Sequence, residues 1–147
     1  MPKLLTYIPC EKVVIDSLTN NVSITSMISE IEIKIPHGVP LPSKGTFVPM
    51  PWNILSVWEW GEQDTNKTFE AKSVLIAQSG EELLETSITK FKREPHKNFQ
   101  RNIDQITGFP IWVPGRAELR LMFRIEGSGE FSQQASFPIV VVHGSVH

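Results

Sequence analysis

The clearest feature of the chain is an alternation of apolar and charged residues in two segments. In residues 30–35 every second residue is isoleucine, and glutamate or lysine stands between them. Residues 118–125 repeat the pattern, with leucine, phenylalanine and isoleucine at one parity and glutamate, arginine and methionine at the other. Because successive side chains of a strand point to opposite faces, this period of two predicts two strands that each bury one face.

Shorter apolar runs along the rest of the chain predict further strands. They are rich in β-branched and aromatic residues, and clusters of glycine, proline, asparagine and aspartate separate them. The continuous run IVVV at residues 139–142 indicates a central strand. Around Ser29 the apolar positions change from even to odd, which indicates a bulge or bend between two strands.

Two segments leave the choice between strand and helix open. In residues 79–93 a serine and a glutamate stand at the spacing of a capping box, and three apolar residues stand at helical spacing. The same segment is rich in threonine, serine and isoleucine, which fit pleated strands better than helices. We therefore favour a hairpin strand here. Residues 98–106 fit either a short helix or an edge strand.

These elements predict an all-β protein with about eight strands and at most one short helix. The expected architecture is a two-sheet antiparallel β-sandwich, immunoglobulin-like or C2-like, with long proline-rich loops. A partly closed β-barrel is the alternative. A chain of 147 residues fits a single β-sandwich domain that spans residues 1–147.

Two proline-bearing segments interrupt the strands. Residues 35–52 contain five prolines, and residues 108–115 contain two prolines and two glycines. The first segment carries too many apolar residues to remain disordered in water. We interpret it as an ordered connection between the strand at residues 31–35 and the strand that contains Trp58.

Charge and composition narrow the possible partners and the compartment. The formal net charge is -2 and the basic residues are scattered among acidic ones, so we expect no nucleic-acid binding. No run approaches the roughly 20 apolar residues of a membrane span, and the apolar run before Pro9 is too short for a signal peptide. The single cysteine, Cys10, excludes an internal disulfide and a cysteine-rich zinc site. The expected location is the cytoplasm, with no membrane partner.

The chain lacks the patterns that mark common catalytic sites. It has neither a nucleophile elbow around a serine nor a glycine-rich phosphate loop. The four histidines, His37, His96, His143 and His147, are too widely spaced to predict a metal site. We therefore predict a protein that is not an enzyme, with no catalytic residue, no cofactor-binding residue, no metal ligand and no cofactor.

Tryptophans and the neighbouring phenylalanines are the best candidates for recognition. Trp58 and Trp60 lie in an apolar strand and are predicted to fill the core. Aromatic residues in proline-flanked loops can reach solvent, where such side chains are enriched at binding hot spots. The candidate partner-binding residues are Phe47, Trp52, Phe109 and Trp112.

Two functions fit these observations. The first is a non-enzymatic cytosolic interaction module that binds a protein partner, or a second copy of itself, through the proline and tryptophan loops and a sheet edge. The alternative is a β-sandwich that binds a small ligand or a glycan, with tryptophans as stacking platforms, including a hydrolase built on such a fold.

Several segments resemble one family. They are LLTYIPCEKVVID at residues 4–16, NNVSITSMI at 20–28, SGEEL at 79–83, PGRAELRLMFRIEG at 114–127 and FPIVVV at 137–142. Together they resemble a family of short uncharacterised bacterial all-β proteins, known as a domain of unknown function. The resemblance implies a cytosolic β-sandwich. It implies no activity and no catalytic residue.

Overall fold

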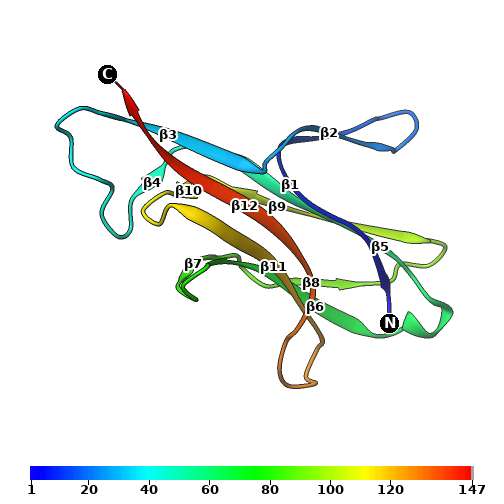
Figure 1. Cartoon of the computed structure of the whole chain (residues 1–147). Coiled ribbons are helices and arrows are strands. Elements are labelled where there is room, and N and C mark those ends of the chain that lie inside the picture. The colour runs from blue at the N-terminus through cyan, green and yellow to red at the C-terminus, as the bar shows by residue number, and fades with distance from the viewer. Residues whose placement is uncertain (147) are drawn as a thin grey trace.

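The structure is a computed structural model that describes residues 1–146, and its regular elements there are β-strands and one short 3-10 turn (Figure 1). The strands in chain order are β1 (Lys3–Ile15), β2 (Val22–Met27), β3 (Glu30–Pro36), β4 (Phe47–Val48), β5 (Trp52–Glu59), β6 (Thr68–Ala77), β7 (Glu82–Glu85), β8 (Thr89–Lys92), β9 (Phe99–Ile106), β10 (Phe109–Pro110), β11 (Gly115–Ile125) and β12 (Ser132–Val146). The 3-10 turn, η1, spans Glu62–Asp64. No helix in the described part of the chain is long and apolar enough to cross a membrane.

The strands form two principal sheets and confirm the predicted all-β class. One sheet has the order β2-β1-β5-β9 with antiparallel neighbours. The other has the order β3-β12-β11-β6, and β7 and β8 both pair with the free side of β6. The chain passes from the first sheet to the second at Ile28 and Ser29, where the backbone N–H of Ile28 donates to the carbonyl of Pro9. The architecture is thus a β-sandwich joined along one side, as in a partly open barrel.

One strand pair departs from the expected antiparallel arrangement. Strand β3 is an edge strand of the second sheet, and it runs parallel to β12 from Glu30 opposite Val140 to Pro36 opposite Val146. A hairpin imposes antiparallel pairing only on consecutive strands. Because β3 enters from the other sheet and β12 comes from the far end of the chain, no turn constrains this pair. The run IVVV lies between β11 and β3, which confirms its predicted central position.

Aromatic rings from both sheets fill one part of the interior. Trp58 is fully buried and stacks on Phe123 with ring centroids 5.0 Å apart. Phe69 stacks on the same ring at 5.5 Å, and Trp60 lies 5.8 Å from Phe69. Large aromatic side chains bury much apolar area and stabilise such a core. The predicted burial of Trp58 and Trp60 is confirmed.

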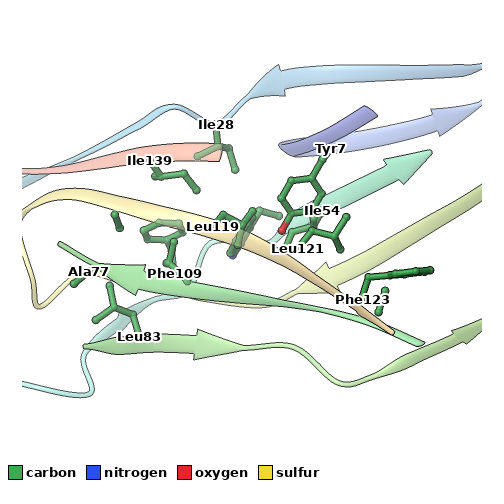
Figure 2. Packing of buried hydrophobic residues seen from close by; sticks show 14 of the residues in the cluster. Tyr7, Ile28, Ile54, Ala77, Leu83, Phe109, Leu119, Leu121, Phe123 and Ile139 are labelled. Carbon is green, nitrogen blue, oxygen red and sulfur yellow. The ribbon is translucent and has the colours of Figure 1, made fainter. Parts of the chain in front are cut away.

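Alternation along β11 produces the facing layer of this core. Figure 2 shows Leu119, Leu121 and Phe123 of β11 reaching into the same layer as Tyr7 of β1 and Ile54 of β5. All five side chains are buried, whereas the residues between those of β11 are only half-buried. The period of two in this segment is therefore confirmed.

The two ambiguous segments are strands. Residues 79–93 contain β7 and β8, which pair with different parts of β6: Leu84 lies opposite Leu75, and Phe91 lies opposite Phe69. Between β7 and β8 the side chain of Thr86 accepts a hydrogen bond from the backbone of Ser73 and bridges the interruption. Strand β9 lies at the edge of the first sheet, so of the two predictions for residues 98–106 the edge strand is confirmed. The pairing with β6 buries apolar side chains that a helix here would turn partly toward water.

Candidate functional site

The two proline-bearing segments meet in space and form one structure. Residues 37–51 connect β3 in one sheet to β5 in the other, as predicted, and include β4. Residues 107–114 include β10, which pairs with β4 so that Phe47 lies opposite Pro110 and Val48 opposite Phe109. We call these two segments together the proline cap. In Figure 1 the cap lies at the left, away from the N-terminus.

Buried aromatic side chains support the cap from below. Trp52 is only 1% exposed, its indole N–H donates to the carbonyl of Gly108 at 2.9 Å, and its ring lies 5.3 Å from that of the fully buried Phe109. Trp52 and Phe109 are two of the four predicted partner-binding residues, and both are buried under the cap. The pairing of β10 with β4 lays the second loop over Trp52, and burial of both rings removes apolar area from water. Neither ring can touch a partner while the cap is closed.

The other two candidate residues lie at the surface of the cap. Phe47 is 44% exposed and makes an edge contact with the half-buried Trp112 at 5.6 Å between ring centroids. On the same loop, Leu41 is 70% exposed and Val39 is 51% exposed. The apolar content of this loop predicts order, but it does not predict that Val39 and Leu41 stay exposed. Their position between prolines was the available signal, because such a loop has little regular structure in which to bury them.

The close approach of the two loops explains one glycine. A Cβ atom on Gly108 would lie 3.3 Å from the carbonyl oxygen of Val48 and 3.4 Å from the Cβ of Phe47. Any larger side chain would push against the backbone of the facing loop. Glycine is therefore the residue that lets the loops pair at this distance.

A separate cleft of about 440 Å³ opens between the two sheets beside the cap. Its walls are residues 84–87 with Thr89 on one side and residues 103–107 on the other. Asp104 of β9 accepts a hydrogen bond from the hydroxyl of Thr89 at 3.2 Å, which links the sheets. Burial raises the pKa of Asp104, and the bond from Thr89 opposes part of that rise.

A tyrosine lies behind this cleft in the core. The hydroxyl of Tyr7 donates to Ser73 Oγ at 2.7 Å, and burial raises the pKa of Tyr7, with a smaller contribution from the charge of Asp104. Nucleophilic catalysis by serine needs a base that takes the hydroxyl proton, usually a histidine. The Oγ of Ser73 instead accepts a hydrogen bond from the hydroxyl of Tyr7, whose pKa is raised. The arrangement satisfies buried hydroxyl groups and does not define a reaction.

The histidines and acids do not gather around a common point in the described part of the chain. Among residues 1–146, no group of three or more His, Cys, Asp or Glu side chains is close enough to hold a metal ion. The Nε2 of His143 donates to the carbonyl of Ile111 at 2.6 Å, which ties β12 to the cap. His147 lies outside the described residues.

No protein-family model matches the chain, and comparison with curated proteins gives no match. The resemblance to uncharacterised bacterial all-β proteins therefore stays a prediction from the segments quoted above. Two features lie together at this end of the molecule: an apolar cap built from paired loops, and a polar cleft beside it that contains Asp104.

Proposed function

We propose that this protein is a non-enzymatic interaction module that binds a protein partner through the proline cap. The observation that carries the proposal is the pairing of β4 with β10, which holds Phe47 at the surface on a loop fixed at both ends. Loops held by a rigid scaffold are the usual carriers of binding residues. The proposal includes a cytoplasmic location, which the single, free and buried Cys10 supports.

Covering the exposed apolar surface of the cap with a partner is more favourable than leaving it in water. Val39, Leu41 and Phe47 expose apolar surface to water, and covering such surface is favourable by roughly 25 cal/mol per Å². The prolines restrict the backbone before any partner arrives, so little conformational entropy is lost on binding. Phe47 adds an exposed aromatic ring to this surface, and aromatic residues are enriched at protein interfaces.

A partner-capture experiment with a matched control tests the proposal. The immobilised wild-type protein is compared with a Phe47→Ser/Leu41→Ser variant and with a Leu18→Ser variant, because Leu18 is 94% exposed on a different loop. We expect partners recovered by the wild type to be recovered by the Leu18→Ser variant and lost with the cap variant. Equal recovery with all three proteins would contradict the role of the cap.

Self-association is distinguished by a second measurement. If the partner of the cap is another copy of this chain, light scattering over a concentration series shows a dimer for the wild type and a monomer for the cap variant. A monomer at every concentration, together with cap-dependent capture, supports a different protein as the partner. Thermal unfolding of each variant establishes that a loss of capture is not a loss of folding.

A further inference from the structure

A second cleft, of about 550 Å³, lies at the opposite end of the first sheet from the proline cap. Its walls are residues 19–22 at the tip of the β1–β2 hairpin, residues 94 and 96–101 around the β8–β9 turn, and Val57. We call it the hairpin cleft. In Figure 1 the hairpin and the β8–β9 turn both lie at the right, and the cap lies at the left.

The hairpin reaches this position by folding back over the first sheet. Strand β1 pairs with β5 only as far as Cys10 opposite Asn53, and beyond that point it pairs with β2 alone. The side chain of Asn53 donates to the carbonyl of Glu11 at 2.9 Å, where β1 leaves β5. The hairpin tip nevertheless lines a cleft with Val57, which is further back along β5. The outer face of the sheet therefore forms the floor, and the hairpin forms one wall.

Arg101 fixes the hairpin wall. Its guanidinium donates to the backbone carbonyl of Asn20 at 2.8 Å and to the side-chain oxygen of Asn20 at 2.9 Å. Within the turn, Asp16 accepts hydrogen bonds from the backbone N–H groups of Leu18 and Thr19. A forked donor that engages two acceptors of one residue orients that residue. The carboxamide of Asn20 is thus held at the rim of the cleft.

The opposite wall is held by backbone contacts. The guanidinium of Arg93 donates to the carbonyl of Lys97 and to that of Gly61, both at 3.1 Å. The carbonyl of Asn98 accepts a hydrogen bond from the backbone N–H of Trp60 at 2.9 Å. The β8–β9 turn is therefore anchored to the end of β5, and both walls are formed before a ligand arrives. Such preformed concave sites are typical of small-ligand binding, and 550 Å³ lies within their usual size range.

The lining combines carboxamide groups with one exposed aromatic ring. The carboxamides belong to Asn20, Asn21 and Asn98, and the next residue, Phe99, is 55% exposed. The carboxamide of Gln100 instead donates to the side-chain oxygen of Asn102. A carboxamide both donates and accepts hydrogen bonds, which matches a ligand hydroxyl that does the same. An aromatic face left in water matches the apolar C–H face of a sugar ring. We propose that the hairpin cleft binds a neutral saccharide, with Phe99 as the stacking surface and the carboxamides as partners of its hydroxyl groups.

The charged side chains of the lining do not form a cluster of free cations. They are Glu94, Lys97 and Arg101, so a carboxylate stands among the two cations. Two N–H groups of Arg101 are already engaged by Asn20. A phosphate site concentrates free cationic donors, and this lining does not. The residues and the position of this site are separate from those of the cap, so the proposal stands or falls independently of the protein-binding function.

Nuclear magnetic resonance titration of the isotope-labelled full chain tests the proposal. The probes are glucose, galactose, mannose, N-acetylglucosamine, cellobiose and chitobiose, with inorganic phosphate as the contrasting probe. We expect at least one sugar to give saturable shifts of backbone amides confined to residues 19–22, 57 and 94–101. The Phe99→Ala variant should raise its dissociation constant about tenfold or more, because the aromatic contact is lost.

Phe47→Ala is the matched control, since it removes an exposed phenylalanine from the other end of the molecule. It should leave the sugar affinity unchanged. If Phe99→Ala does not fold, Asn98→Ala supplies the test through a lost hydrogen-bond partner. Three results would each overturn the proposal: no saturable shift with any sugar, shifts that centre on the cap, or saturable binding of phosphate alone.

Discussion

The two ends of the first sheet are built on opposite principles. At the proline cap, two loops lie over the buried rings of Trp52 and Phe109, and the exposed residues are apolar. At the hairpin cleft, a hairpin turns back over the outer face of the sheet, and the contact of Asn20 with Arg101 holds its tip. One end is held by burial and exposes apolar surface. The other is held by surface hydrogen bonds, and its cleft is lined by carboxamides beside the exposed ring of Phe99.

This difference has consequences for how each end responds to change. Burial of large rings contributes several kcal/mol, whereas a hydrogen bond at the surface contributes about 0.5–1.5 kcal/mol net. The cap should therefore open only at a large cost in free energy, and the hairpin should move at a small one. A rigid apolar surface suits recognition of a preformed protein surface. A polar cleft whose walls are already formed suits a small ligand.

The largest expected effect comes from removing the ring that supports the cap. Trp52→Ala should lower the free energy of unfolding by about 3–5 kcal/mol, because it leaves a cavity beneath Gly108 and Phe109 and removes a donated hydrogen bond. Urea unfolding measures the loss. Amide resonances of residues 107–114 should shift, and those of residues 19–22 should not.

Trp52→Phe separates the two causes of that loss. The variant keeps an aromatic ring against Phe109 but leaves the carbonyl of Gly108 without its donor, so we expect a smaller loss of about 1–3 kcal/mol. If Trp52→Ala cost no more than Trp52→Phe, ring burial would not be what holds the cap, and the contrast between the ends would be wrong.

Gly108→Ala should weaken the cap without removing anything from it. Its new Cβ would press on the carbonyl oxygen of Val48, a backbone atom that can move only if β4 moves, and we expect a loss of about 1–2 kcal/mol. Gly144→Ala is the matched control. There the nearest atom, at 3.1 Å, is the end of the flexible Glu32 side chain, which can swing away. Equal losses in thermal or urea unfolding would show that the approach of the loops is not limiting.

Much of the fold followed from short-range patterns. The alternation in β11 and the aromatic strand β5 predicted their burial, because each segment must hide one face whichever strand lies next to it. The choice of partners did not follow in the same way. The parallel pairing of β3 with β12 joins segments that are 110 positions apart at Glu30 and Val140, and no local signal encodes the direction of such a pair.

The surface sites were less predictable because they depend on contacts between distant residues. β4 and β10 have two residues each, too few to show a period, and their pairing decides that Trp52 is buried while Phe47 is not. Similarly, Asn20 and Arg101 are 81 positions apart, and each alone is an ordinary surface residue. Only the fold-back of the hairpin brings the carboxamides of the cleft around Phe99.

A fall in pH should change the stability contributed by Asp104 and by Asp16 in opposite directions. The pKa of Asp104, in the cleft beside the cap, is raised by burial, so the folded state binds its proton more tightly than the unfolded state does. The stability from this group is present below the ordinary value of about 3.9 and is lost as the pH rises through the folded pKa. The pKa of Asp16, in the hairpin turn, is lowered by the N–H groups of Thr19 and Leu18. Its stability is present above the ordinary value and is lost as the pH falls through the folded pKa.

Urea unfolding of the wild type and two variants over a pH series measures both effects. Asp104→Asn should stabilise the protein relative to the wild type above the raised pKa, and this advantage should vanish in acid. Asp16→Asn should destabilise it at neutral pH, with the difference vanishing in acid. If the unfolding free energies of the two variants changed with pH in the same way, the predicted electrostatic difference between the two ends would be wrong.

The smallest expected effect is the release of the hairpin tip. Arg101→Lys keeps the charge but replaces a forked donor with a single ammonium, which cannot reach both acceptors of Asn20 in the same geometry. We expect a loss of about 0.5–1 kcal/mol in unfolding free energy and faster amide hydrogen exchange in residues 16–21. Arg116→Lys on the exposed start of β11 is the matched control and should change neither. Unchanged exchange in the hairpin of the Arg101 variant would show that burial against Val57, rather than the arginine, positions this wall, and the two ends would then share one means of stabilisation.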